Sequence, residues 1–544
     1  MYAALAFVGL LIWEQWQADY GPKPDPVAQI QQESQTEAQN FNAPSINDLP
    51  ESITDSNPSD LSAQSSTAKG RLITVETDVF EAKIDTQGGV IKSIKLKDYP
   101  VDVEHPNEYL ELIYNRDDSV YIIQNGLRSA SSPAPTHYSL FSTAQSEYVM
   151  QEGQQTLSVP FSWTENGIKV VKTYEFHRGD HLIKVNHKVE NSTSETWSGS
   201  QYRQIQRSKP LKTSRILYTY TGAVVYNDEI KYEKIKFEDM EDKPFQQKSV
   251  GGWAAMIQHY FLSAWIAEPG KENLLYSISN AKNSPATYTI GMRSEALQLA
   301  PGTQGEFNAE LFVGPKVVDR LEAISPGLEL TVDYGVLTFI SKPLYWLLEF
   351  YQNIVGNWGL AIILLTLTVK GIFFKLSETS YRSMAKMRKV GPRLKTLKER
   401  YGDDRQKMNQ AMMDLYKTEK INPMGGCLPM LVQIPVFIAL YWALLESVAL
   451  RQAPFILWIN DLSVMDPYYV LPLLMGASML IQQKLNPAPP DPIQAKVMMA
   501  LPVVFTVFFA FFPAGLVLYW VVNNTLSIAQ QWIITKRIEA GEMK

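Results

Sequence analysis

Four long apolar runs after residue 335 constrain the fold of this chain more than any other feature. Three contain no charged residue, and these cover residues 423–445, 467–483 and 497–535. The fourth, residues 354–374, contains a single charge, Lys370. About 20 apolar residues in a helix cross the roughly 30 Å hydrocarbon core of a bilayer. The run 497–535 is too long for one crossing, and the turn that begins at Pro513 is expected to divide it into two helices.

A further apolar segment lies near the start of the sequence, in residues 2–13. It has no basic residues before it and no small-residue cleavage site after it. We therefore interpret it as a retained anchor, with a cleaved signal peptide as the alternative. The chain is then predicted to have six transmembrane helices, with expected bounds at 1–18, 354–376, 423–446, 466–483, 497–512 and 514–535. The fourth and fifth are short for a bilayer, which implies local thinning or tilting of the lipid.

The charges of the loops predict the orientation of these helices. Residues 375–420 contain thirteen Lys and Arg against six Asp and Glu, whereas residues 446–466 contain one against three. Basic loops remain on the cytoplasmic side of a membrane. The predicted cytoplasmic segments are the loop 377–422, the loop 484–496 and the tail 536–544. Both termini are then cytoplasmic, while the loop 447–465 and the large N-terminal half lie outside the cytoplasm.

The N-terminal half reads as a tether followed by a β domain. Residues 19–69 are rich in Gln, Ser, Asn, Asp and Pro, which predicts a disordered tether. Residues 70–325 form short alternating segments such as RLITVETDVFEAKI, which predict a large all-β sandwich. His177 and His181 have the spacing of helical metal ligands, but the Arg-Gly-Asp between them indicates a hairpin turn. We predict no metal, no cofactor and no catalytic residues.

Two amphipathic segments flank the run that contains Lys370. Residues 338–353 are predicted to form a helix that lies flat at the membrane surface, with a buried connecting helix as the alternative. The basic loop 377–422 is predicted to form an antiparallel hairpin of helices over 378–400 and 404–419. Its methionines would suit either an adaptable surface for apolar peptides or the packing of the hairpin, and they are Met384, Met387, Met408 and Met412. Its basic face would suit anionic lipid headgroups or ribosomal RNA.

Several segments carry a resemblance to a known family. They are GGWAAMIQHYFLSAWI (251–266), the hairpin 383–423, NPMGGCLPMLVQIPVFIALYWALL (422–445) and FPAGLVLYWVVNNTLSIAQQW (512–532). Together they resemble the YidC/Oxa family of membrane protein insertases, in its Gram-negative form, over nearly the whole chain. The resemblance implies a multi-span α-helical membrane protein of the bacterial inner membrane, with a five-helix insertase core and a periplasmic all-β supersandwich. The implied activity is not enzymatic.

The resemblance also implies a mechanism and a set of partners. Members insert nascent membrane proteins and help them fold, alone or with the Sec translocon. They do so through a hydrophilic groove that is open to the cytoplasm and the lipid and closed to the periplasm. The implied partners are nascent membrane proteins, the ribosome, Sec translocon components and membrane lipids, with no role for DNA.

Lys370 occupies the position where the family carries a positive residue, most often arginine, on its first core span. Lysine keeps the charge but lacks the planar fork of arginine. A charge in hydrocarbon costs about 2.5–3.5 kcal/mol or more, so it usually marks a site. The alternative is a lysine that snorkels to the interface.

Other polar residues are expected to share the groove with Lys370, and these are Thr366, Gln433, Asn523 and Asn524. Ordinary hydrogen bonding between helices is the alternative for each of them. Tyr519 and Trp520 would line a slide toward the lipid, or simply pack against it. A solute transporter or channel would also explain an intramembrane lysine, but no inverted repeat is evident.

Overall fold

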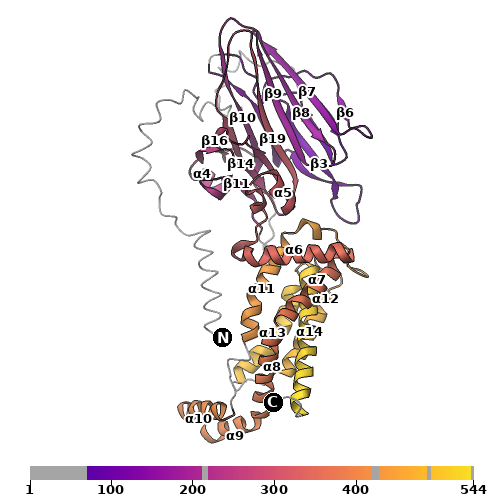
Figure 1. The fold of residues 1–544 in the computed structure, drawn as a ribbon, viewed down its shortest axis with the longest axis vertical. Coiled ribbons are helices and arrows are strands. Elements are labelled where there is room, and N and C mark those ends of the chain that lie inside the picture. Colours follow the sequence, from indigo (N-terminus) through magenta and orange to yellow (C-terminus); the bar gives the residue numbers. More distant parts are fainter. Residues whose placement is uncertain are drawn as a thin grey trace. The chain divides into compact units, whose positions relative to one another are not determined.

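The computed structural model describes residues 70–130, 132–210, 219–402, 404–419, 428–486 and 492–540. The anchor predicted at 1–18 and the tether predicted at 19–69 lie outside these residues. The chain divides into two compact units between residues 332 and 333. The unit before this boundary is a β domain, and the unit after it is helical (Figure 1).

The described part of the β domain contains two antiparallel-rich sheets. The first has the strands β1 (Leu72–Glu76), β2 (Phe80–Asp85), β3 (Val90–Pro100), β4 (Tyr109–Asn115), β5 (Val120–Arg128), β6 (Glu147–Val149), β10 (Trp197–Ser208), β13 (Gln246–Val250), β16 (Glu272–Asn280), β17 (Thr287–Ser294) and β18 (Leu297–Leu299). Their order is β13-β16-β17-β10-β5-β4-β3-β2-β1-β6, with β18 paired to β10.

The second sheet has the strands β7 (Thr156–Glu165), β8 (Ile168–His177), β9 (Leu182–Asn191), β11 (Gly222–Asn227), β12 (Lys231–Ile235), β14 (Trp253–Ile257), β15 (Phe261–Ile266) and β19 (Gln304–Pro315). Their order is β12-β11-β14-β15-β19-β9-β8-β7. Three short helices accompany the sheets, namely α4 (Phe237–Asp242), α5 (Val318–Ile324) and η4 (Leu328–Thr331).

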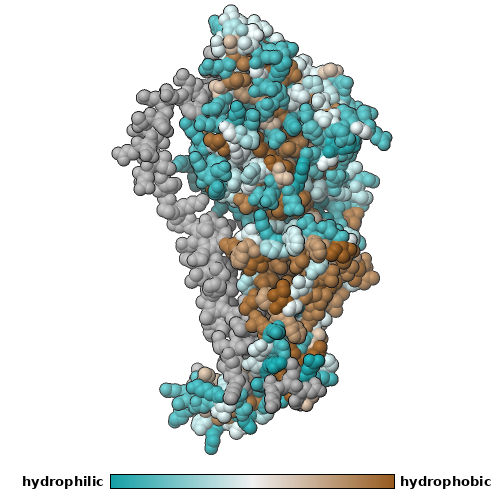
Figure 2. All heavy atoms as spheres, viewed as in Figure 1, coloured by the Kyte–Doolittle hydropathy of each residue, from teal (hydrophilic) through white to brown (hydrophobic). Residues whose placement is uncertain are grey.

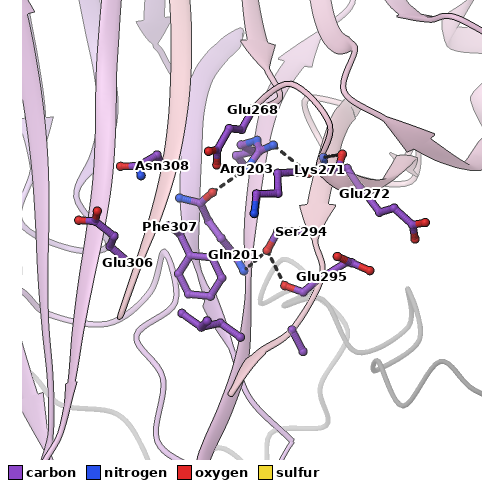
Figure 3. A pocket seen from close by; sticks show the side chains of 13 residues that line it. Gln201, Arg203, Glu268, Lys271, Glu272, Ser294, Glu295, Glu306, Phe307 and Asn308 are labelled. Atoms are coloured by element: carbon purple, nitrogen blue, oxygen red, sulfur yellow. Dashed lines mark hydrogen bonds between the residues drawn. The ribbon is translucent and has the colours of Figure 1, made fainter. Parts of the chain in front are cut away.

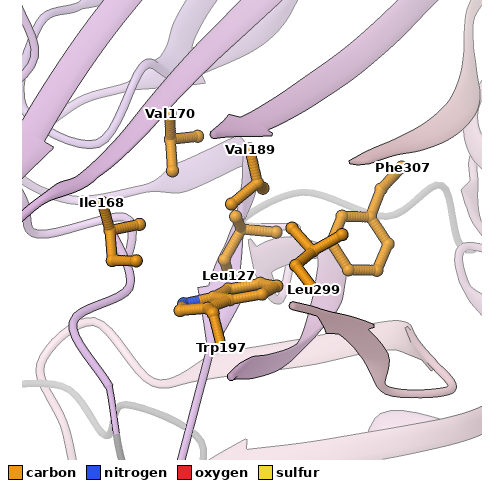
Figure 4. Packing of buried hydrophobic residues seen from close by; sticks show 7 residues of the cluster. All are labelled: Leu127, Ile168, Val170, Val189, Trp197, Leu299 and Phe307. Carbon is orange, nitrogen blue, oxygen red and sulfur yellow. The ribbon is translucent and has the colours of Figure 1, made fainter. Parts of the chain in front are cut away.

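Alternating side chains place the core of the β domain between its sheets. Along β8 every second residue is buried, as the period of two in a strand requires. Leu127, Trp197 and Leu299 of the first sheet pack against side chains of the second sheet (Figure 4). Those side chains are Ile168, Val170, Val189 and Phe307. The prediction of an all-β sandwich is confirmed.

The turn between His177 and His181 has the form expected from the sequence. Strand β8 ends at His177 and β9 begins at Leu182, and the two strands pair in antiparallel register. Gly179 between them has a φ of +69°, a conformation that glycine adopts without strain. The two histidines therefore sit at opposite sides of a hairpin turn.

The described helical unit is a bundle with one helix across one end and a small hairpin at the other (Figure 1). Its helices are η5 (Gly335–Leu337), α6 (Thr338–Val355), α7 (Trp358–Ile372), α8 (Phe374–Lys389), α9 (Gly391–Tyr401), α10 (Arg405–Thr418), α11 (Leu428–Leu445), η6 (Val448–Leu450), α12 (Val470–Leu485), α13 (Pro492–Phe509) and α14 (Ala514–Glu539). Figure 2 shows apolar residues gathered over the bundle and hydrophilic residues over α9 and α10.

Helix α6 has one buried face and one exposed face. Ser341 and Leu348 are fully buried, and the Ser341 hydroxyl donates to the carbonyl of Ala439 in α11 at 3.0 Å. On its other side Phe339 and Trp346 are 72% and 64% exposed. A helix with such an aromatic outer face is typical of a membrane interface.

The predicted two-helix loop after Lys370 is wrong in one respect, because the described residues there form three helices. Helix α8 follows α7 at a bend of 67° and ends at Lys389, and α9 then begins at Gly391. Pro392 is the cause, since a proline in the first turn of a helix has no N–H to continue the preceding one. The second predicted helix is present as α10, which Asp404 caps through the N–H of Lys407 at 3.1 Å.

Among the described residues, no individual helix has both the length and the apolar composition that crossing a membrane requires. The bent pair α7 and α8 meets both criteria when the two helices are taken together.

Candidate functional site

Lys370 lies in the last turn of α7 and points toward α14. Its ammonium donates a hydrogen bond to the Ser527 hydroxyl oxygen at 2.7 Å. Ser527 is 3% exposed, and its own hydroxyl donates to the carbonyl of Asn523 at 2.7 Å. Twelve further residues of α14 follow Ser527, or about 18 Å of helix at 1.5 Å per residue. The ammonium thus ends within the bundle, which favours a site over a snorkelling side chain.

The charge of Lys370 has no counter-ion in the described part of the chain. Ser527 is the one hydrogen-bond partner of its ammonium there, and no carboxylate lies within ion-pair distance. An ammonium has three N–H donors, so two remain for another acceptor. A buried cation whose partner is a neutral hydroxyl is costly, because its charge is not compensated. For the same reason it attracts a carboxylate strongly.

Two other polar residues from the sequence prediction meet beside this contact. The Gln433 amide in α11 donates to the side-chain oxygen of Asn523 at 2.5 Å. Asn523 and Ser527 are four residues apart and therefore lie on the same face of α14. The chain of contacts Gln433, Asn523, Ser527 and Lys370 links α11, α14 and α7. We call these four residues the polar seam.

Thr366 lies one turn before Lys370 but does not offer its hydroxyl to the seam. It is fully buried, and its hydroxyl donates to the Ile362 carbonyl of its own helix at 2.6 Å. This contact is the usual way in which a threonine within a helix satisfies its hydroxyl. The position of Thr366 agrees with the prediction, but its hydroxyl proton is bound within its own helix.

Asn524 lies on a different face of α14 from the seam. Its amide donates to the Ser478 hydroxyl of α12 at 3.0 Å, and Asn524 is 5% exposed. Two turns further along the same face, the Gln531 amide donates to the side-chain oxygen of Asn486 at 3.0 Å. These contacts join α14 to α12. For Asn524 the structure thus shows the alternative of interhelical hydrogen bonding, and not a place in the groove with Lys370.

Tyr519 and Trp520, predicted to form a slide, lie in an aromatic cluster. Tyr519 is 2% exposed and its ring centroid is 6.1 Å from that of Phe437. Trp520 is half-buried and packs against Phe437 at 4.4 Å and against Phe509 of α13 at 4.9 Å. Of the two, only Trp520 has surface left to offer a passing helix.

The methionines of the basic loop pack the helices to which they belong. Met387 and Met412 pack with Val390 and Tyr416 inside the α9–α10 end of the loop. Met384 packs on a cluster in which Tyr381 of α8 contacts the last turns of α14. Met408 is half-buried. The structure favours the packing alternative for Met384, Met387 and Met412.

Sequence reasoning missed Ser527, Ser478, Asn486 and Gln531. Serine in an apolar helix gives a weak signal, because a hydroxyl can bond back to its own helix. The spacing contained usable information, however, since Ser527 is four residues after Asn523 and Gln531 is seven after Asn524. Two polar stripes on one helix indicate two polar contacts with neighbouring helices.

The β domain contains a polar pocket of ≈ 190 Å³ between residues of both sheets (Figure 3). Arg203, 2% exposed, donates to the side-chain oxygens of Gln201 at 2.7 Å and Asn273 at 2.9 Å. The carboxylates around it, such as Glu268 and Glu295, are exposed. Among the described residues, no group of three or more His, Cys, Asp or Glu is placed to hold a metal ion. Of the described residues that line the pocket, Ser294 donates its hydroxyl to the backbone carbonyl of Glu295 at 2.9 Å.

Comparisons with known proteins decide the family. The family described as the YidC periplasmic domain matches residues 72–347, and the family described as 60Kd inner membrane protein matches residues 350–541. The chain belongs to the YidC family. The family match supports the insertase interpretation of the sequence, and it gives no support to the transporter or channel alternative.

Full-length YidC relatives share about half of their residues with this chain. The membrane protein insertase YidC of Nitrosococcus oceani is 51% identical over 99% of this chain and 98% of its own length. That of Thioalkalivibrio sulfidiphilus is 52% identical over 100% of this chain and 99% of its own. A solved structure of an active YidC insertase, with its first transmembrane domain resolved, covers 85% of this chain and 92% of its own at 16% identity and a TM-score of 0.38.

Proposed function

We propose that this chain inserts nascent proteins into the bacterial inner membrane and helps them fold, alone or with the Sec translocon. The polar seam is the proposed substrate groove, open to the cytoplasm and the lipid. The observation that carries this proposal is the Lys370 ammonium, which is held inside an apolar bundle by one neutral hydroxyl. The relatives of the chain are named membrane protein insertases, which supports the same activity.

The proposed topology has six membrane spans with both termini in the cytoplasm and the β domain in the periplasm. In support, α7, α11, α12, α13 and α14 correspond to the five predicted core spans. The basic residues of α8 to α10 fit a cytoplasmic loop. At the other end of the bundle, the N–H of Ala514 donates to the Val464 carbonyl at 2.7 Å and that of Gly515 to the Leu462 carbonyl at 2.9 Å. These bonds would help to close the groove toward the periplasm.

The proposed mechanism requires no covalent chemistry. The Lys370 ammonium attracts an acidic or polar tail of the substrate into the seam, which shortens the distance that the tail crosses without water. Helix α12, with 16 residues, spans about 24 Å and would thin the bilayer nearby. The membrane potential then acts on an acidic tail with about 2.3 kcal/mol per charge per 100 mV, while the apolar segment of the substrate partitions into lipid.

The partners follow from the surfaces of the helical unit. The substrates are nascent membrane proteins delivered by the ribosome, and Sec translocon components assist with some of them. The positive charges of α8 to α10 suit ribosomal RNA and anionic lipid headgroups. The aromatic outer face of α6 suits the lipid interface. No cofactor takes part.

Substitution of Lys370 tests this proposal in cells depleted of their own insertase. Lys370→Arg should retain insertion, Lys370→Ala should lower it, and Lys370→Glu should lower it most for substrates with acidic tails. Lys484 is exposed in the last turn of α12, outside α8 to α10, so Lys484→Glu is the matched control and should leave insertion unchanged. Equal insertion by wild type and all three Lys370 variants would overturn the proposed role of the seam.

A further inference from the structure

Ser527 is the one residue of the polar seam whose side chain contacts the ammonium of Lys370. It accepts from the ammonium at 2.7 Å and donates to the carbonyl of Asn523 at 2.7 Å. Because its proton is committed to this carbonyl, its lone pairs are left for the Lys370 ammonium and for the Tyr381 hydroxyl of α8, which also bonds to Ser527. The acceptor of that proton is a backbone carbonyl of α14 itself, so the helix fixes its position.

Lys370 lies near the end of α7, where few neighbouring groups of its own helix restrict its side chain. Helix α7 ends two residues later, at Ile372, and the chain then bends by 67° into α8. A side chain added at Gly371 would meet open space. A lysine has four methylenes and about 2 kcal/mol of rotamer entropy, so without a partner its ammonium would sample many positions.

We propose that Ser527 is a positioning residue that holds the Lys370 ammonium in the seam and directs its two remaining N–H donors at the carboxylate of a substrate tail. This inference rests on the proposed function. A hydroxyl suits the task better than a carboxylate, because an acid at this place would neutralise the charge that attracts the substrate. Ser527 thereby sets the preference of the groove for acidic tails. If Ser527 served only to give α14 a polar face, it would not affect this preference.

The chain offers a matched set of variants. Ser527→Thr keeps the hydroxyl and adds a methyl group. Ser527→Val has nearly the same shape as the threonine variant but lacks the hydroxyl, and Ser527→Ala is a smaller second variant without it. Thr525 is exposed on the same helix, and its hydroxyl bonds back to the Val521 carbonyl at 2.8 Å. Thr525→Val is therefore the control for loss of a hydroxyl that does not touch Lys370. Lys370→Ala and the double variant Lys370→Ala with Ser527→Val complete the set.

The measurement is insertion of a substrate with an acidic tail, relative to the same substrate with each Asp and Glu of the tail changed to Asn and Gln. Ser527→Val and Ser527→Ala should lower this ratio at least about tenfold, the lower end of what is expected for loss of a hydrogen bond to a charged group. Ser527→Thr should restore it, and Thr525→Val should not change it. In the Lys370→Ala background, Ser527→Val should have no additional effect.

The alternative outcomes separate the two proposals. If Lys370→Ala lowers the ratio and Ser527→Val does not, the positioning role is overturned while the proposed function stands. If Ser527→Val lowers insertion of both substrates equally, or lowers the amount of folded protein, the residue is structural and the positioning role is likewise overturned. If Lys370→Ala has no effect on either substrate, the role of the seam fails and this inference fails with it.

Discussion

Each unit of the protein holds a lysine in its interior, Lys172 fully buried and Lys370 half-buried, and the two ammonium groups have very different partners. In the β domain, Lys172 is fully buried, and its ammonium donates to the carbonyls of Gly88 at 2.6 Å and Asn125 at 2.9 Å. It also lies 5.0 Å from the ring centroid of Phe141. In the helical unit, the ammonium of Lys370 has one hydroxyl as its partner among the described residues.

The difference separates a structural cation from the cation that we propose to attract substrate. Lys172 is enclosed by backbone carbonyls that cannot move away, and burial lowers the pKa of its ammonium to about 7. No ligand can reach it without opening the sandwich. Lys370 keeps spare donors beside other polar side chains, so a substrate can complete its coordination. A buried charge therefore marks a site when its partners are few, and a structural role when they are complete.

The largest expected effect separates the two lysines. Lys172→Met keeps the stem and removes the ammonium, which leaves two buried carbonyls without that donor. We expect the free energy of unfolding of the β domain to fall by about 2–4 kcal/mol. Lys370→Met should leave the stability of the helical unit unchanged and lower insertion. Hydrogen exchange of the full-length protein measures both units, and increased exchange around α7 in Lys370→Met would break the comparison.

A second effect concerns acid. Burial, followed by the charges of Lys172 and Lys92, lowers the pKa of His137 to about 3. Below pH 6.5 the unfolded chain binds a proton at this residue and the folded domain does not, so stability present above pH 6.5 is lost as the pH falls. Between pH 7 and pH 5 the loss from His137 should be about 2 kcal/mol. Denaturant titrations at the two pH values measure it.

The same titrations of His137→Gln provide the control for the acid effect. This variant should lose part of the acid sensitivity. Part should remain, because burial also lowers the pKa of His187. A pH dependence that is identical in wild type and variant would contradict the assignment to His137.

A third, smaller effect concerns α8 to α10, the loop that we propose to be cytoplasmic. Met412 packs in the cluster with Val390 and Tyr416, whereas its neighbour Met413 is 46% exposed. Met412→Ser should destabilise the α9–α10 hairpin by about 1 kcal/mol and raise its cleavage by protease. Met413→Ser should do neither. If Met412→Ser instead weakens crosslinking to nascent chains with no change in cleavage, the methionine belongs to a receiving surface.

The smallest expected effect on insertion comes from deletion of the β domain. Deletion of residues 70–320, with α6 retained, should leave insertion of substrates that do not need the Sec translocon unchanged in a depletion-rescue assay. The reason is that the seam and the helices around it lie wholly within the helical unit. Loss of all insertion by a stably expressed deletion variant would show that the β domain takes part in the step itself.

The sequence alone predicted much of the architecture, because period and composition act locally. Alternating residues indicated the strands of the sandwich, and the Arg-Gly-Asp turn after His177 was recognised from its residues. Long apolar runs located five helices close to their observed bounds. A charge inside an apolar run identified Lys370, and polar residues inside other runs identified Gln433 and Asn523, as candidates for the groove that the resemblance implies. The end of α8 before Pro392 was not predicted, although the proline that causes it is visible in the sequence.

Only the tertiary structure decided which polar residues meet. Asn523 and Asn524 are adjacent in sequence and equally polar, but about 100° of rotation per residue turns one toward Gln433 and the other toward Ser478. Ser527 gained its importance from a lysine 157 positions away. In the β domain, the carbonyls that enclose Lys172 come from strands and turns distant in sequence. Local pattern determines where a helix or strand forms, whereas the partners of a buried charge depend on how those elements pack.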